Sequence, residues 1–468
     1  MKKEKTMKYS SSSSSSASSS YYFYFFKERC LNKGRLPPFF MSFLLLTVIF
    51  ILFILYSTTP LTPISNQALS RNLRLPVIKP PPNLPRKGKP RIFHPPLQGY
   101  DDGISKCDLS KGHWIPDLRG SLYTNSSCTT IPDSKNCFHH GRSDRDFLNW
   151  RWKPDQCNLP RFDPKAFLDF VKGKTLGFVG DSVARNHMES LLCLLSKVET
   201  PKDEYKDSED RKRIWYFPKH DFTLMILWSR YLVSAEERMV NGSLSGNFNL
   251  HLHKIDEEWS KDLPLLDYVI ISAAHWFFRP IFVHNSTGIV GCVYCNTPNV
   301  KDYGVGFTLK LAFRSALNHI NNCKTCKVRV TLVRTFSPAH FEDGAWNTGG
   351  RCNRTSPLGE SEINLRTTEW ELRSMQMEEI EKANIKGAKV GRRFGALDIT
   401  RAMLMRPDGH PNEFWGNKWM KGYNDCVHWC LPGPVDEKSS AANSIYVKLR
   451  VGMNYVFENL MTLNTGLN

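Results

Sequence analysis

The sequence predicts an α/β fold in which a parallel, doubly wound sheet is flanked by helices. From Pro164 onward, short apolar runs of strand length alternate with longer segments whose apolar residues recur at helical spacing. This alternation is typical of parallel strands joined by crossover helices. Hydrophobic residues make up 41% of the 468-residue chain, which is enough for the buried core that such a sheet requires.

The expected elements follow one another in a regular order. They are strands at Thr175–Val179, Phe222–Trp228, Asp267–Ala274, Val328–Thr335 and Ala396–Thr400, and helices at Val183–Leu195, Phe307–Ile320, Glu360–Ala383 and Ala442–Leu460. In sheets of this kind, active sites lie beyond the carboxyl ends of the strands. The residues that directly follow each strand are therefore the first candidates for chemistry.

Three segments of different composition are expected before this domain. Residues 1–38 predict a basic tail with a serine tract, residues 39–58 a transmembrane anchor, and residues 59–106 an extended stalk rich in Pro and Lys. The anchor is predicted from Phe39–Tyr56, an uncharged apolar run whose length is near the minimum that can span a bilayer. The alternative is a cleaved signal peptide, which has a shorter apolar core and a small-residue cleavage site that is missing here.

The distribution of charge predicts how the anchor is oriented. Residues 1–38 carry eight Lys and Arg against two Glu, whereas the first basic residue after the anchor is Arg71. The positive-inside rule then leaves the N-terminus in the cytosol and the rest of the chain in a lumen. An apolar run this short suits the thinner membranes of the early secretory pathway. We expect a single-pass type II protein of the Golgi membrane with its catalytic domain in the lumen.

The formal net charge of +18 belongs mostly to the N-terminal segments. Residues 1–106 hold 16 Lys and Arg against four Asp and Glu, so the other 362 residues carry only +6. The folded domain is therefore not expected to present a strongly basic surface, and the sequence contains no nucleic-acid-binding motif. Nucleic acid is excluded as an expected partner.

The cysteines agree with a luminal location. Only Cys30 of the thirteen precedes the anchor, and the other twelve are an even number, as expected for disulfides in an oxidising compartment. Asn-x-Ser/Thr sequons, which are predicted glycosylation sites, also follow the anchor. They begin at Asn125, Asn241, Asn285 and Asn353.

Two regions are expected after the stalk. Residues 107–163 contain four cysteines and little periodicity, which predicts a smaller, loop-rich lobe stapled by disulfides. Residues 164–468 form the larger domain that contains the sheet. This division places most of the predicted regular structure in the second region.

Two Cys-x-x-Cys pairs in the larger domain allow two interpretations. Cys292 with Cys295 and Cys323 with Cys326 could together hold a structural zinc ion. The 27 residues between the pairs exceed the usual spacing of such sites, and an oxidising lumen favours local disulfides. We therefore expect two short disulfide loops and no metal site.

The motif Gly180-Asp181-Ser182 directly follows the first strand and precedes a helix. Glycine lets the backbone turn tightly, and the serine hydroxyl then stands at the helix N-terminus, where free amides and the macrodipole stabilise an oxyanion. We predict that Ser182 is a nucleophile, supported by Gly180 and Asp181 in the turn and by Arg185 and Asn186 near the oxyanion. The alternative is that Asp or Ser merely caps the helix.

A serine nucleophile needs a base, and the base needs a group that orients it. The segment Asp425-Cys426-Val427-His428 offers both, because Asp425 and His428 are close enough in one loop to meet directly. The flanking Cys426 and Cys430 suggest that this loop is pinned in place, which a catalytic pair requires. We predict that His428 is the base and that Asp425 orients it.

Other histidines are rivals for this role. His275 and Trp276, just past the end of a predicted strand, are the best candidates for binding the acceptor substrate or supporting the site. The remaining candidates are predicted to be mostly structural or on the surface. They are His187, His251, His253, His340 and His410.

Several stretches together carry a family resemblance. The lobe contains CDLSKGHWIPD, SLYTNSSC and NCFHHGRSDRDFLNWRWKPDQCNLPRFD, and the larger domain contains GDSVARNHMES and NDCVHWCLPGP. From Cys107 to about Leu460, the chain resembles the plant trichome-birefringence-like family of polysaccharide O-acetyltransferases. The resemblance implies an SGNH/GDSL-like fold with a triad of Ser182, Asp425 and His428.

The resemblance also implies disulfide pairings and a substrate. The implied disulfides are Cys107–Cys157, Cys128–Cys193, Cys137–Cys430 and Cys352–Cys426. The stretches HWF, CVYC, CKTC and VRTFSPAHFEDGAWNTGGRCNRT resemble the subgroup that acetylates the side-chain galactose of xyloglucan. Mannan acetyltransferases are similar in these stretches and remain the alternative. The modest charge of the domain fits a neutral glucan better than pectin.

The expected reaction is a two-step acetyl transfer through an acetyl-serine. It needs acetyl-CoA or another Golgi acetyl donor and no tightly bound cofactor, and other Golgi proteins of wall synthesis are candidate partners. An esterase acting on acetylated polysaccharide would use the same triad, whereas a non-catalytic binder of wall polysaccharide would not need it. A glycosyltransferase is disfavoured because the only Asp-x-Asp motif, Asp144-Arg145-Asp146, does not follow a strand.

Overall fold

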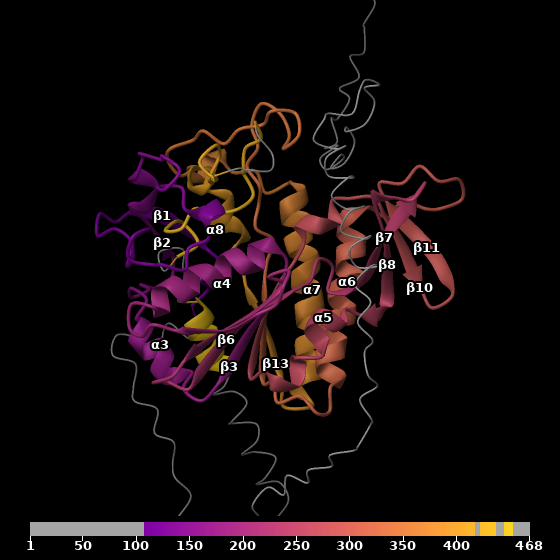
Figure 1. Cartoon of the computed structure of the whole chain (residues 1–468), viewed down its shortest axis with the longest axis horizontal. Helices are drawn as coiled ribbons and strands as arrows, with labels where there is room; N and C mark the ends of the chain where they lie inside the picture. The colour runs from indigo at the N-terminus through magenta and orange to yellow at the C-terminus, as the bar shows by residue number, and fades with distance from the viewer. Residues whose placement is uncertain (1–106, 417–421, 437–443, 453–468) are drawn as a thin grey trace, which may run out of the picture. The chain divides into compact units, whose positions relative to one another are not determined.

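A computed structural model describes residues 107–416, 422–436 and 444–452 (Figure 1). The predicted tail, anchor and stalk lie outside the described residues. Within the described ranges, no helix combines the length and apolar character of a membrane span.

The centre of the fold is a seven-stranded sheet with the order β13-β12-β9-β3-β6-β5-β4. The strands are β3 (Thr175–Gly180), β4 (Lys202–Lys206), β5 (Lys212–Phe217), β6 (Phe222–Trp228), β9 (Tyr268–Ser272), β12 (Val330–Arg334) and β13 (Arg393–Leu397). The run from β13 to β6 is parallel, which confirms the predicted arrangement for the middle of the sheet. At the other edge β5 and β4 are antiparallel, so the sheet is mixed.

The edge strand β4 has no apolar run, whereas its antiparallel neighbour β5 (KRIWYF) has one that is not among the predicted strands. β4 reads KDEYK and exposes every side chain. Charged, exposed strands of this kind are usual at sheet edges, where they discourage pairing with other chains.

Helices cover both faces of the sheet (Figure 1). One core cluster joins α3 (Pro164–Phe170), α4 (Ser182–Leu195) and helical residues 444–452 to one face, and another joins α6 (Gly304–Asn322) and α7 (Thr368–Ala388) to the other. β9 illustrates the arrangement, since Ile270 packs in the first cluster and Ile271 in the second. Strands buried on both faces are expected in a parallel sheet, and they explain the continuous apolar runs of the sequence.

Two predicted elements differ most from the structure in their bounds. The helix expected at Glu360–Ala383 begins only at Thr368, after a separate 3-10 turn at Glu360–Glu362. Acidic residues then occupy the first turn of α7, where they complement the helix dipole. The strand expected at Ala396–Thr400 ends at Leu397, and Thr400 already begins α8 (Thr400–Leu404).

A second sheet of four strands is absent from the sequence prediction. It comprises β7 (Val233–Val240), β8 (Ser243–Ile255), β10 (Ile281–Asn285) and β11 (Gly288–Val293), in the order β11-β10-β8-β7. It lies to one side of the main sheet, next to α6 (Figure 1). β7 and β8 are hard to recognise because most of their side chains are polar or exposed, as in VSAEERMV of β7, and the apolar runs of β10 (IFVHN) and β11 (GIVGCV) are short.

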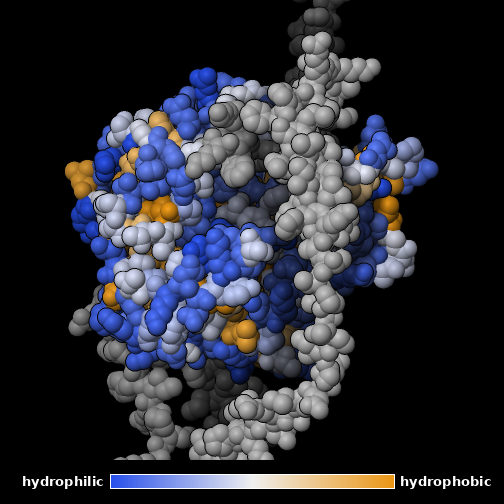
Figure 2. Space-filling model, in the orientation of Figure 1, coloured by the Kyte–Doolittle hydropathy of each residue, from blue (hydrophilic) through white to orange (hydrophobic). Residues whose placement is uncertain are grey.

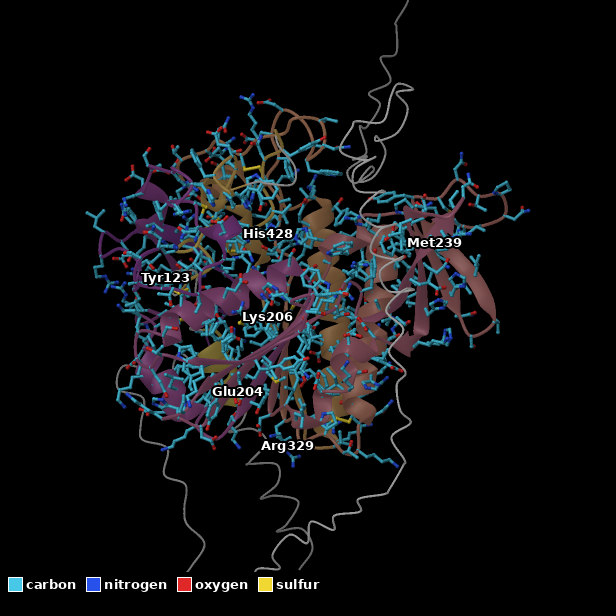
Figure 3. All side chains as sticks on the ribbon, in the orientation of Figure 1. Tyr123, Glu204, Lys206, Met239, Arg329 and His428 are labelled. Atoms are coloured by element: carbon cyan, nitrogen blue, oxygen red, sulfur yellow. A yellow bond between two sulfur atoms is a disulfide. The ribbon has the colours of Figure 1, made fainter. Side chains whose placement is uncertain are left out.

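The surface of the described residues is largely hydrophilic on the face seen in Figure 2. Exposed apolar side chains gather on the second sheet, where Figure 3 labels Met239. They are Met239, Val240, Leu244, Ile289 and Val290.

The cysteine-rich region contains little regular structure, as expected. Its two strands, β1 (Gly112–Pro116) and β2 (Trp150–Pro154), form a small antiparallel sheet. Two disulfides tie this region to the larger domain. The disulfides are Cys107–Cys157, Cys128–Cys193, Cys137–Cys430, Cys352–Cys426, Cys292–Cys295 and Cys323–Cys326. The pairings implied by the resemblance and the two short loops are therefore confirmed.

Candidate active site

The turn between β3 and α4 requires glycine at its first position. Gly180 has a φ of 147°, and a Cβ atom there would lie 1.8 Å from the carbonyl oxygen of Ser272 on β9. That carbonyl accepts a hydrogen bond from the backbone of Asp181, which joins the ends of β3 and β9. Any side chain at position 180 would therefore force these two strands apart.

Asp181 caps α4 and also fixes a neighbouring loop. One carboxylate oxygen accepts from the backbone N–H of Val183 at 3.0 Å. The other accepts from the backbone N–H groups of Ala274 and His275 at 3.1 and 3.3 Å. The capping interpretation of this motif is thus true of Asp181, while Ser182 begins the helix and is half-buried.

Asp425 and His428 meet directly, as the sequence predicts. Asp425 Oδ2 lies 2.8 Å from His428 Nδ1, and Asp425 Oδ1 accepts from the backbone N–H groups of Val427 and His428. Burial opposes the charged carboxylate, but the imidazole beside it and these hydrogen bonds hold the pKa of Asp425 below its ordinary value. His428 Nε2 is buried and has no hydrogen-bond partner among the described residues, which leaves it available as a base.

A side chain on α4 holds the Asp-x-x-His loop against the nucleophile helix. Asn186 accepts from the backbone N–H of Trp429 at 2.7 Å and donates to its carbonyl at 3.2 Å, although 243 positions separate the two residues. Asn186 lies one helical turn after Ser182, and Trp429 directly follows His428. The contact holds the loop that carries His428 against the helix that begins at Ser182, and Figure 3 shows His428 beside α4.

Disulfides pin the same loop from two other directions. Cys426 is bonded to Cys352, and Cys430 is bonded to Cys137 of the cysteine-rich lobe. The predicted pinning of the loop by its two cysteines is therefore present in the structure.

His275 lies against the Gly-Asp-Ser turn. Its Nε2 is 2.9 Å from the carbonyl oxygen of Ser337, so the ring carries its proton on Nε2. Burial lowers the pKa of His275 and keeps the ring neutral. The backbone N–H of His275 donates to Asp181 and its ring donates to Ser337, so the residue supports the turn from the β9 side.

Trp276 and Arg185 lie at the edge of the site. The Trp276 ring sits between the guanidinium groups of Arg230 and Arg279, at 4.6 and 4.2 Å from the ring centroid. Arg185 projects toward the turn between β4 and β5, where it forms an ion pair with Asp210 at 3.2 Å. Neither the Arg185 nor the Asn186 side chain is free of protein contacts.

A cleft of about 810 Å³ runs along one face of α4. Its walls are α4, the loop that follows Cys128, and the edge formed by β5 and β6, with Trp228 in register beside Gly180. It is lined by Thr129, Thr130, Ile131, Pro132, Ser134, Lys135, Arg185, Met188, Glu189, Leu192, Glu209, Asp210, Arg211, Arg213, Trp215, Trp228 and Arg230. Sequence reasoning missed this cleft, although Trp228 ends a predicted strand and was open to the same strand-end argument as His275.

Comparison with known families matches almost all of the described chain. Residues 159–439 match the GDSL/SGNH-like acyl-esterase family found in Pmr5 and Cas1p, and residues 105–158 match the PMR5 N-terminal domain.

Individual relatives are similar over most of their length. The chain is 58% identical to xyloglucan O-acetyltransferase 4 of Populus trichocarpa, over 88% of this chain and 92% of the relative. It is 53% identical to xyloglucan O-acetyltransferase 2 of Arabidopsis thaliana, over 90% and 95% respectively. The trichome birefringence-like 26 protein of Arabidopsis thaliana is 41% identical, over 76% and 78%.

Proposed function

This chain belongs to the GDSL/SGNH-like acyl-esterase family found in Pmr5 and Cas1p, and we propose that it is an O-acetyltransferase of plant cell-wall xyloglucan. One observation carries the proposal. The Asp425–His428 pair is held to the helix that begins at Ser182 by the side chain of Asn186. A nucleophile, a base and an orienting carboxylate are thereby gathered at the carboxyl end of the sheet.

The first half of the reaction forms an acetyl-enzyme. Ser182 Oγ attacks the carbonyl carbon of the acetyl donor while His428 Nε2 takes the hydroxyl proton and Asp425 stabilises the imidazolium. Backbone amides in the first turn of α4, with the helix dipole, stabilise the oxyanion. The leaving group of the donor departs with the proton from His428, which leaves Ser182 acetylated.

The second half transfers the acetyl group to sugar. His428 takes the proton of an acceptor hydroxyl, and the resulting oxygen nucleophile attacks the acetyl-serine carbonyl carbon. The tetrahedral intermediate collapses with return of the proton to Ser182, so donor acetyl becomes sugar acetyl with no net change in the enzyme. The donor is acetyl-CoA or another Golgi acetyl donor, and no tightly bound cofactor is needed.

Xyloglucan is the proposed acceptor because the relatives at 53% and 58% identity carry that substrate in their names. The cleft along α4 offers contacts that suit a glycan. Trp228 offers an aromatic face for a sugar ring, and the surrounding arginine, acid and threonine side chains offer hydrogen bonds to hydroxyls. Side-chain galactose is the proposed site of acetylation.

We place the enzyme in the Golgi membrane as a single-pass type II protein with the described domain in the lumen. Six disulfides among the described cysteines suit an oxidising compartment. The proposed glycosylation sites are the sequons at Asn125, Asn241, Asn285 and Asn353, of which Asn241 and Asn353 are exposed.

The test is acetyl transfer by the purified full-length chain in detergent. Acetyl-CoA is supplied with galactosylated xyloglucan, degalactosylated xyloglucan, mannan or xylan oligosaccharides, and added acetyl mass is measured. Acetylation confined to the galactosylated acceptor and lost in Ser182→Ala supports the proposal. The matched control is Ser196→Ala, at the other end of α4, which should retain activity.

Other outcomes would correct the proposal. Acetylated mannan would keep the mechanism and replace the substrate. Steady release of free acetate from acetylated xyloglucan, without transfer to any acceptor, would identify an esterase. Full transfer by Ser182→Ala would overturn the mechanism.

A further inference from the structure

Two histidines lie directly behind the Asp-x-x-His loop. His410 Nδ1 is 2.6 Å from the carbonyl oxygen of His428, and His410 Nε2 is 2.7 Å from His340 Nδ1. The backbone N–H of His340 also donates to the carbonyl of Cys426. The two histidines therefore contact the loop on both sides of Val427.

The hydrogen-bond partners determine where the protons are. A carbonyl oxygen only accepts, so His410 must carry a proton on Nδ1 to bond to His428. In a neutral ring, His410 Nε2 is then an acceptor, and His340 must carry its proton on Nδ1 to reach it. Burial lowers the pKa of His340 to about 4 and lowers that of His410 well below its ordinary value, so both rings are neutral near pH 7.

One contact is given up in this neutral arrangement. His340 Nε2 lies 3.0 Å from the carbonyl of Leu404, but a neutral ring has no second proton to donate there. Of the two carbonyl contacts, the one from His410 to His428 is shorter, which favours keeping the proton on His410 Nδ1. The result is a directed relay in which His340 donates to His410 and His410 donates to the backbone of His428.

Aromatic packing and backbone contacts make this relay rigid. The His410 ring stacks on Trp429 with centroids 4.0 Å apart, and Trp429 is the residue whose backbone Asn186 holds from the other side. Arg142 donates to the carbonyl of His410 at 2.9 Å. The peptide that carries His428 is thus fixed between α4 and the histidine pair.

We propose that His410, oriented by His340, is a positioning residue for the catalytic base. This rests on the proposed function. By holding the carbonyl of His428, His410 sets the direction in which the imidazole leaves the backbone, so that Nδ1 meets Asp425 and Nε2 faces the serine. His410 contacts neither the reacting atoms nor the α4 cleft, so its effect should fall on turnover rather than on acceptor binding.

Matched variants of the full-length chain separate this role from simple packing. In His410→Phe the ring still stacks on Trp429 but cannot donate, whereas in His410→Asn an amide N–H takes the place of Nδ1–H. We expect kcat for acetyl transfer to fall about 10- to 100-fold in His410→Phe, with KM for xyloglucan within about 2-fold, because small misplacements of catalytic groups are costly. His410→Asn should recover most of kcat.

His340 provides an independent check should His410→Phe fail to fold. His340→Asn keeps a donor at the Nδ1 position and should retain most of kcat, whereas His340→Phe frees the His410 tautomer and should lower kcat. Thermal unfolding of each variant is measured alongside.

The results distinguish this proposal from the proposed function. Wild-type kcat in a folded His410→Phe, or in His340→Phe where His410→Phe is unfolded, overturns the positioning role. Equal losses in the Phe and Asn variants with a raised KM overturn it also, since they indicate packing alone. In both cases transfer by wild type and its loss in Ser182→Ala still support the function, whereas no transfer by wild type, or full transfer by Ser182→Ala, refutes the function itself.

Discussion

The Gly-Asp-Ser turn and the Asp-x-x-His loop lie beside the same helix, α4, but are held in place by different means. The turn is part of regular structure, because Gly180 ends β3, Ser182 begins α4, and the backbone of β9 fixes the bend between them. The loop from 422 to 436 contains no helix or strand among its described residues. Instead of regular structure, two disulfides and the side chains of Asn186 and His410 hold this loop in position.

Substitutions in the turn and in the loop should therefore have different consequences. Damage to the turn should disturb the sheet and therefore the whole fold. Damage to the loop should spare the sheet and remove activity first, because a loop held by a few contacts can move while the core stays intact.

The largest effect is expected from Gly180→Ala. The new methyl group would overlap the carbonyl of Ser272, so β3 and β9 could not remain paired at their ends. We expect a loss of more than about 5 kcal/mol in the free energy of unfolding, measured by chemical denaturation. Gly242→Ala is the control, because that glycine also has a positive φ but no atom near its would-be Cβ. A Gly180→Ala protein as stable as this control would contradict the steric argument.

The next largest effect concerns the disulfide beside the base. Cys352 and Cys426 are 74 positions apart, so replacing both with serine frees a long loop in the unfolded chain and should cost about 4 kcal/mol. Activity should fall further than stability explains, because Cys426 lies between Asp425 and His428. Thermal unfolding and transfer rates at a temperature where the variant is folded measure the two effects.

The short disulfide loop at Cys323 and Cys326 supplies the contrast. Its cysteines are only three positions apart, so replacing them with serine adds little entropy to the unfolded chain and should leave full activity. If the two replacements lowered stability and activity equally, the loop that carries His428 would depend on its disulfide no more than the short loop at Cys323 and Cys326 does.

A smaller effect is expected from loss of the hydrogen bonds between Asn186 and Trp429. Asn186→Ala leaves the buried N–H of Trp429 without its partner, which should cost about 1–3 kcal/mol. The matched control is Asn384→Ala, which removes a similar side-chain bond to the backbone of Phe394, far from the triad. Both variants should lose stability, but only Asn186→Ala should also lose kcat at a temperature where both are folded. Equal kcat in the two would show that the loop does not rely on α4.

The sequence predicts the turn better than the loop, because the turn is part of regular structure and the loop is not. Gly180-Asp181-Ser182 lies between an apolar strand and an amphipathic helix, so its position at the carboxyl end of a strand follows from local patterns. The pairing of Asp425 with His428 also follows from their spacing. The clamp by Asn186 could not be predicted, since it joins residues that only the complete fold brings together.

The same limit applies to the histidines. His340 and His410 are expected to be structural or on the surface, and in the structure His410 is buried and His340 partly buried. Nothing in their spacing indicates that they bond to each other across 70 positions. The second sheet is missed for a different reason, because β7 and β8 are largely polar or exposed and the apolar runs of β10 and β11 are short.

The smallest effect is the pH dependence that Asp425 adds to stability. The pKa of Asp425 is depressed in the folded protein, so its contribution is fully present above the unfolded-state pKa of about 3.9 and is lost as pH falls toward the folded value. Asp425→Asn has no such titration. The free energy of unfolding of wild type should therefore exceed that of the variant at pH 6 and approach it as pH falls below about 4. A difference independent of pH would mean that the carboxylate gains nothing from His428 in the folded state, and that the loop, unlike the turn, is held by its covalent and backbone contacts alone.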